Sequence, residues 1–149
     1  LCIMKKLVDK PYAGGTYSLS RMRSFVIGAL RRARWPIKYS ALNTAFVRHG
    51  ENKQTGRKCK LHQCQECLTL HPQNGMQLDH VEPVVPVDGK WGDTTEWLGY
   101  NWNELLPRLF CEVDNYQALC KTCHSGKCDE ERALRKHYRE EKRDEAKDE

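Results

Sequence analysis

The chain is 149 residues long, 39% hydrophobic and 30% charged, with a formal net charge of +5. This length suits one domain with an appendage, and no apolar run approaches the roughly 18 residues that a membrane span needs. The few residues before Lys5 lack the apolar region of a secretory signal. We therefore expect a cytoplasmic protein, and neither a membrane protein, a secreted disulfide scaffold nor a disordered chain.

The charge is distributed unevenly along the chain. Residues 1–63 hold 14 basic and two acidic residues, residues 64–128 hold four and nine, and residues 129–149 hold seven and nine. A basic N-terminal part beside an acidic centre favours a polyanion-binding surface next to a site for divalent cations, because these two ligands need surfaces of opposite charge.

The N-terminal third predicts an irregular lead-in over 1–17 and then a basic helical arm over 18–58. The main helix of the arm is predicted over 21–35, with Ser20 as its N-terminal cap and Pro36 as its end. A shorter helix over 40–48 and a polar loop over 50–58 complete the arm.

The main helix of the arm has an apolar stripe that can dock on a core, and its arginines lie outside this stripe. These arginines are Arg21, Arg23, Arg31, Arg32 and Arg34. A run of basic residues is often only a solvated helix face. Since no acidic residue stands between Ser20 and Lys38, contact of these arginines with nucleic acid is an equally good hypothesis.

The centre of the chain, over 59–128, holds seven of the eight cysteines and four of the six histidines. Two extended segments are predicted on either side of Asn74-Gly75, the second over 76–81. Asp93 and Glu96 resemble a capping box. The remaining predicted elements are a helix over 95–106, a loop entering a helix over 114–125, and a charged helical tail without its own core over 129–149.

Two Cys-x-x-Cys pairs predict a metal site. Cys64 and Cys67 form one pair, and Cys120 and Cys123 form the other, with 52 residues between the two pairs. Each pair can grip one ion, and two pairs complete the tetrahedral thiolate set of a structural zinc site. Such a zinc ion would hold the segment between the pairs in place.

Other interpretations of these cysteines are weaker. A redox Cys-x-x-Cys or buried free thiols would explain one pair but hardly two. The run from Cys120 to His124 matches the attachment motif of c-type haem, but haem would leave Cys64 and Cys67 unexplained. Cys59 and Cys128 lie near enough in sequence to be substitute ligands.

A second set of residues surrounds the cysteine pairs. Asp79-His80 lies between the pairs, Asn115 precedes the second pair, and His124 and Lys127 follow from it. Each residue alone is weak evidence, but in this order they resemble the HNH endonuclease family, which has the ββα-metal (His-Me finger) fold. The resemblance covers 59–128 and is closest to the phage and bacterial subgroup with two zinc-binding Cys-x-x-Cys pairs.

The resemblance implies a role for each of these residues. Asp79 and His124 would bind one catalytic divalent cation, Mg²⁺, Mn²⁺ or Ni²⁺. His80, on the opposite face of its strand from Asp79, would deprotonate a water as general base, and Asn115 would orient the loop beside it. Lys127 would either contact a neighbouring phosphate or be solvated.

One position departs from part of the family. Some HNH nucleases have a second histidine four residues after the metal-binding histidine, and in this chain Cys128 occupies that position. Since other branches use two protein ligands, we interpret Cys128 as a subgroup difference. It leaves the preferred catalytic metal open.

The resemblance implies an α+β fold with a small zinc-stapled ββα-metal core. The rest of the sequence adds an N-terminal basic helical arm and a charged C-terminal helix to the expected fold. The implied function is a metal-dependent DNA endonuclease. Family members often act with the large terminase of phages, so the expected partners are DNA and such a terminase, in the cytoplasm of a bacterial host. The alternative is a catalytically inactive zinc module that binds DNA or RNA, which would not need Asp79, His80 and Asn115.

Overall fold

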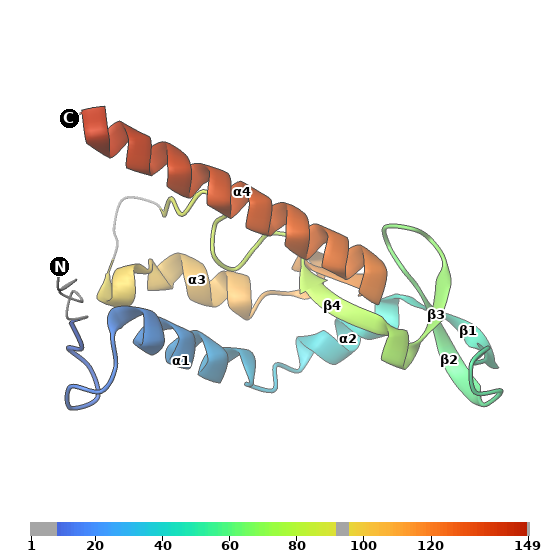
Figure 1. Cartoon of the computed structure of the whole chain (residues 1–149). Coiled ribbons are helices and arrows are strands. Elements are labelled where there is room, and N and C mark those ends of the chain that lie inside the picture. Colours follow the sequence, from blue (N-terminus) through green and yellow to red (C-terminus); the bar gives the residue numbers. More distant parts are fainter. Residues whose placement is uncertain (1–8, 92–95, 149) are drawn as a thin grey trace, which may run out of the picture.

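The protein is an α+β domain in which helices surround two small antiparallel sheets (Figure 1). The computed structural model describes residues 9–91 and 96–148. The helices are α1 (Leu19–Arg31), α2 (Ile37–Thr44), α3 (Trp102–Leu109) and α4 (Lys121–Asp148). The strands are β1 (Phe46–Glu51), β2 (Lys58–Gln63), β3 (Leu70–Pro72), β4 (Met76–His80) and β5 (Tyr116–Cys120).

A ββα unit forms the centre of the molecule. Strands β4 and β5 are antiparallel, with Asp79 opposite Gln117 and His80 opposite Tyr116, and α4 begins at the residue after β5. Met76, Ala118 and Leu119 are buried together with the cysteines of the metal site. The expected α+β class is therefore confirmed, whereas the second strand of this unit lies where the sequence predicted a loop.

The second sheet was predicted only in part. Strand β3 precedes Asn74-Gly75 as expected, but it pairs with β2, whereas β4 pairs with β5. A single turn of 3-10 helix over Gln73–Gly75 separates β3 from β4. The two extended segments therefore belong to different sheets instead of forming a hairpin.

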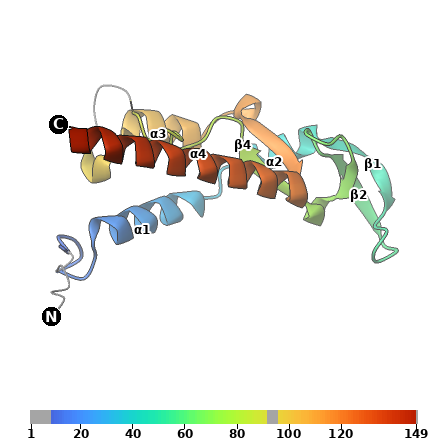
Figure 2. The ribbon, with the colours of Figure 1, turned by 45° about the horizontal axis from the view of Figure 1, so that its top comes forward.

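Strand β1 contradicts the predicted helix over 40–48 and the boundary between arm and core at residue 58. Helix α2 ends at Thr44, and the chain then pairs with β2 as a hairpin. Phe46 and Val47 favour a strand over a helix, and pairing decides between the two. Residues 46–58 therefore belong to the sheet beside the metal site, and the hairpin projects from the end of the molecule opposite both termini (Figure 2).

Helix α1 is shorter than predicted. Its N-cap is Ser18, whose hydroxyl accepts a hydrogen bond from the backbone N–H of Arg21, and it ends at Arg31, four residues before the predicted end. The segment after α1 is fixed instead by Trp35, whose Nε1–H donates to the carbonyl of Cys111 at 2.8 Å. Ile27 packs the helix against the core formed with α3.

Helix α3 begins later than predicted, at Trp102 instead of residue 95. Its cap is Asn101, whose side chain accepts from the backbone N–H of Glu104 and donates to the Glu104 carboxylate. Asn101 thus caps the helix, but its second bond to Glu104 comes from the side-chain amide and not from the backbone N–H, so it is not the capping box that was expected for Asp93 and Glu96. Asp93 lies outside the described residues.

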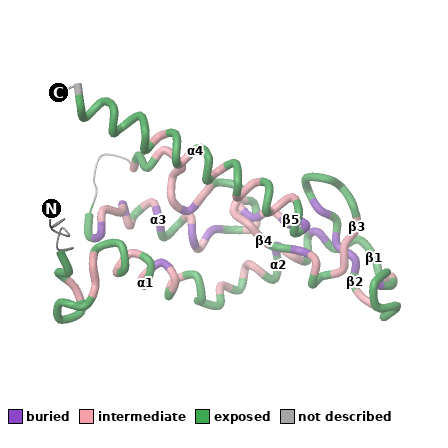
Figure 3. The backbone as a smooth tube through the Cα atoms, viewed as in Figure 1, coloured by how far each residue is buried: buried purple, intermediate pink, exposed green. Residues whose placement is uncertain are grey.

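Helix α4 runs unbroken from the metal site to the C-terminal end of the described chain. The sequence predicted a loop entering a helix over 114–125. The helix is present as the first turn of α4, but β5 takes the place of most of the loop, and the boundary predicted at residue 128 falls inside the helix. The C-terminal half of α4 is mostly exposed (Figure 3), as expected of a helix without its own core. Across residues 9–91 and 96–148, no helix combines the length and the apolarity needed to cross a bilayer.

Candidate active site and metal centre

Four cysteines converge between the two sheets. The Sγ atoms of Cys64, Cys67, Cys120 and Cys123 all lie within 4.8 Å of one another. Within the described ranges, this is the one group of three or more His, Cys, Asp or Glu side chains placed to share a metal ion. The predicted four-cysteine metal site is therefore present, and its donor set is compatible with structural zinc.

A tight turn shapes the first cysteine pair. The backbone N–H of Leu68 donates to the carbonyl of Cys64 at 2.9 Å, and Leu68 has a φ of 60°, in the left-handed region. Gln65 ties the turn to β5, because its N–H donates to the carbonyl of Ala118 while its side-chain oxygen accepts from the Ala118 N–H. These bonds hold the first pair against the strand that ends in Cys120.

The immediate neighbours of two of the cysteines shift their pKa values in opposite directions. Hydrogen bonding from Thr69 lowers the pKa of Cys67 to about 5, whereas the neighbouring sulfur of Cys120 raises the pKa of Cys123 to about 12. Four adjacent thiolates repel one another, and a divalent cation is the group that offsets this repulsion. Cys59 and Cys128, the possible substitute ligands, lie outside the cluster.

A groove of about 990 Å³ lies between α1 and α4 and is lined by residues of β4. Asp79 and His80 from the end of β4 line it together with His124 from the second turn of α4. The structure thus brings together three of the residues that the sequence singled out, although His124 is 44 residues from His80.

His80 is held in one orientation. Its Nε2–H donates to the carbonyl of Leu109 at 3.2 Å, and its ring packs on Tyr116 with the ring centres 4.8 Å apart. Since Nε2 carries the proton in this hydrogen bond, Nδ1 is the nitrogen with a free lone pair. Burial lowers the pKa of His80, so the ring is neutral and can accept a proton near neutral pH.

Asn115 fixes the loop that follows β4. Its side-chain oxygen accepts from the backbone N–H of Glu82, and its carbonyl accepts from the N–H of Val81, both at 2.9 Å. These two bonds hold the chain directly after His80. Asn115 itself does not line the groove.

Lys127 points toward the floor of the groove. Its Nζ lies 2.5 Å from Oδ2 of Asp79, donates to the carbonyl of His80 and lies 3.4 Å from Oε1 of Glu131. The sequence suggested a contact with phosphate or with solvent, but Lys127 is bonded to the carboxylate expected to bind a cation. Because Lys127 belongs to α4 and Asp79 to β4, the ion pair between them also docks α4 on β4.

The five arginines that the sequence singled out lie on α1 and directly after it. Arg23 donates through Nε to the carbonyl of Leu98 at 2.6 Å, and Arg21 stacks over the ring of Tyr17. Arg23 and Arg31 line the groove, and Arg32 and Arg34, beyond the end of α1, are exposed. Contact of these guanidinium groups with phosphate stays a prediction.

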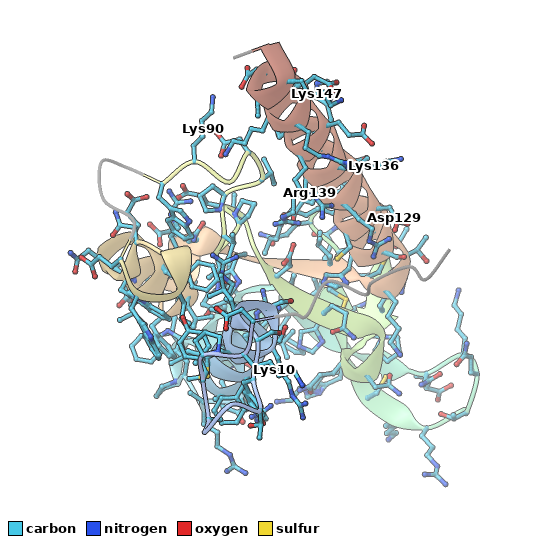
Figure 4. All side chains as sticks on the ribbon, turned by 60° about the vertical axis from the view of Figure 1, so that its left-hand side comes forward. Lys10, Lys90, Asp129, Lys136, Arg139 and Lys147 are labelled. Atoms are coloured by element: carbon cyan, nitrogen blue, oxygen red, sulfur yellow. The ribbon has the colours of Figure 1, made fainter. Side chains whose placement is uncertain are left out.

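The groove is also lined by cations that the sequence did not assign to a site. Arg132, Arg135 and Arg139 come from α4, and Lys38 comes from α2. Figure 4 shows Arg139 on the side of α4 that faces the rest of the molecule and Lys136 on the opposite side. These arginines lie 8, 11 and 15 residues after His124, close to whole numbers of helical turns, and this spacing was the signal that they share its helix face.

Comparison with models of protein families, with curated proteins and with solved structures finds no match to this chain. A functional assignment therefore depends on the side chains themselves. In the part of the chain that the structure describes, chemically active side chains gather in the groove and in the four-cysteine cluster.

Proposed function

We propose that this protein is a metal-dependent DNA endonuclease of the HNH class. The observation that carries the proposal is the convergence of Asp79, His80 and His124 in one groove, on two antiparallel strands followed by a helix. The order of these residues along the chain and the four adjacent cysteines agree with the resemblance seen in the sequence.

In the proposed reaction, Nδ1 of His80 takes a proton from a water molecule whose oxygen attacks the phosphorus. A P–O bond forms, and the bond to the 3′-oxygen breaks. Asp79 and His124 would hold a divalent cation, Mg²⁺, Mn²⁺ or Ni²⁺, which when bound supplies positive charge to the phosphate and the leaving oxygen. Asn115 would be a positioning residue, since it holds the loop next to His80.

The walls of the groove suit a nucleic-acid backbone. Arg31 and Lys38 lie on one side and Arg132 and Arg139 on the other, around the acidic floor. Such side chains bind phosphates without reading sequence. A phage-encoded enzyme acting with a large terminase in the host cytoplasm is the biological setting that we propose from the resemblance alone.

Cleavage of supercoiled plasmid tests this function. We expect the purified protein to produce nicked or linear plasmid in the presence of Mg²⁺, Mn²⁺ or Ni²⁺, and Asp79→Ala and His124→Ala to raise the divalent-cation concentration required. Tyr39→Ala, which changes an exposed side chain outside the groove, is the control. Intact plasmid with all three cations would contradict the proposal.

The contact between Lys127 and Asp79 favours a second candidate, a zinc module that binds DNA or RNA without cutting it. In that case the ammonium group would be the permanent partner of the carboxylate. The same plasmid assay separates the two candidates, because the inactive module would shift the mobility of nucleic acid and leave it uncut.

Lys127→Met is expected to raise the affinity of the groove for Mn²⁺ about fivefold, the equivalent of about 1 kcal/mol for a partly exposed ion pair. The physical reason is that Nζ of Lys127 competes with a cation for Oδ2 of Asp79. Free Mn²⁺ can be measured by electron paramagnetic resonance in zinc-loaded protein, so the result does not depend on activity.

The matched control is Lys136→Met, which removes a lysine on the outer side of the same helix, where it pairs with Glu140. It should leave Mn²⁺ affinity unchanged. Equal affinities for wild type and Lys127→Met would show that Lys127 does not compete for Asp79.

A further inference from the structure

A second hollow, of about 670 Å³, lies between the β1–β2 hairpin, β3 and the first turn of α4. Leu61, Leu70 and Pro72 form apolar parts of its lining. Three cations surround it, Arg48 from β1, Lys53 from the hairpin loop and Lys121 from the start of α4. The proposed catalytic groove does not include any of them.

The three cations have no acidic partner. Arg48, Lys53 and Lys121 are exposed, and none of them takes part in an ion pair in the portion of the chain that the structure describes. Glu51 is the one carboxylate among the lining residues. The hollow therefore has an excess of positive charge available to an anion.

The hairpin fixes the backbone that carries two of these cations, Arg48 and Lys53. Asn52 is buried in the turn, where its N–H donates to the carbonyl of Arg57 and its side-chain oxygen accepts from the N–H of Gln54, both at 2.9 Å. The strands on either side pair continuously from Arg48 to Glu51. Little backbone entropy would therefore be lost when this hairpin binds a ligand, and the cost of binding is confined to ordering the side chains.

One face of α4 connects the hollow with the catalytic groove. At 100° per residue, Lys121 lies on the same face as the groove residues that follow it. These are His124, Cys128, Arg132, Arg135 and Arg139. A ligand that follows this helix face from the groove toward the N-terminus of α4 reaches Lys121 and then the hairpin.

We propose that this hollow binds backbone phosphates of the nucleic acid beyond the segment held in the catalytic groove, through Arg48, Lys53 and Lys121. The inference rests on the proposed function, because it takes the groove to hold a nucleic acid. A polymer fits better than one small anion, since the cations come from both the hairpin and the start of α4 and continue along α4.

The test compares two double variants of the same hairpin, Arg48→Ala/Lys53→Ala and Lys58→Ala/Lys60→Ala. Both remove two positive charges, but Lys58 and Lys60 line a different hollow. Both are made in a His80→Ala background, so that a fluorescent 30-base-pair duplex stays intact during anisotropy titrations at several salt concentrations. Zinc content and circular dichroism confirm that each variant is folded.

We expect Arg48→Ala/Lys53→Ala to weaken binding at least tenfold and to make the slope of log affinity against log salt shallower by about 1.8, or about 0.9 per lost phosphate contact. Lys58→Ala/Lys60→Ala should weaken binding less than threefold. The charge-retaining variant Arg48→Lys/Lys53→Arg should bind as the parent does. Equal losses in the two alanine variants would overturn the inference, since only net charge would then matter.

Two further outcomes separate this inference from the proposed function. If the wild-type protein cuts plasmid but Arg48→Ala/Lys53→Ala leaves DNA affinity unchanged, the inference is overturned and the proposed nuclease function stands. Titration with inorganic phosphate tests whether the hollow binds a small free anion instead of a nucleic-acid backbone. Tight phosphate binding that is lost in this variant, with unchanged DNA affinity, would assign the hollow to a free anion.

Discussion

His80→Ala is expected to reduce DNA cleavage by roughly 10²–10⁴-fold, the usual loss when a general base is removed. Nε2 of His80 is occupied by the carbonyl of Leu109, which leaves Nδ1 as the proton acceptor in the groove. Single-turnover cleavage of plasmid under saturating protein measures the effect on the chemical step. DNA affinity and zinc content should remain close to those of the wild type, because His80 contacts neither phosphate nor the cysteine cluster in the proposed arrangement.

His49→Ala is the matched control, since His49 is an exposed histidine of β1 outside the groove. It should retain wild-type cleavage. Because the ring of His80 also packs on Tyr116, the melting temperature of His80→Ala must be checked as well. A folded His80→Ala protein with more than half of the wild-type rate would exclude His80 as the base.

Cys64→Ser and Cys123→Ser are expected to lose the zinc ion and, with it, the folded structure around β2, β5 and the start of α4. Binding energy in a structural zinc site is folding energy, of about 10–16 kcal/mol in small zinc domains. Cys64 is fully buried, at 0% exposure, and lies in the core cluster with Met76 and Leu119. Elemental analysis and thermal unfolding followed by circular dichroism check both parts of this expectation.

Cys59→Ser provides the control for this second prediction. Cys59 lies in the middle of β2 and outside the four-cysteine cluster, so its replacement should preserve zinc and folding. Active wild-type protein with less than about half an equivalent of zinc would contradict the prediction. A visible haem spectrum would do so too.

The parts of the structure that could be predicted from sequence are those decided by local patterns. The spacing of Cys64 and Cys67, and of Cys120 and Cys123, indicates a shared ion because two residues between cysteines allow both sulfurs to face one point. The strand that carries Asp79 was also expected, since it follows the turn residues Asn74-Gly75 and ends before Pro83.

The parts that sequence reasoning missed depend on pairing between distant segments. Phe46 can end a helix or begin a strand, and only pairing with β2 decides between them. The hydrogen bond from Arg23 to Leu98 joins residues 75 positions apart, so no local pattern reveals that this arginine is engaged. The inward position of Lys127 likewise depends on how α4 packs on β4.

The length of α4 connects the cysteine cluster with the arginines at the far end of the groove. Cys123 and Arg139 lie on the same continuous helix, about 24 Å apart along its axis at 1.5 Å per residue. A tilt of about 10° at the first turn would displace Arg139 by about 4 Å, more than the length of a hydrogen bond. The direction that α4 takes at the cysteine cluster therefore decides where Arg139 lies at the other end of the groove.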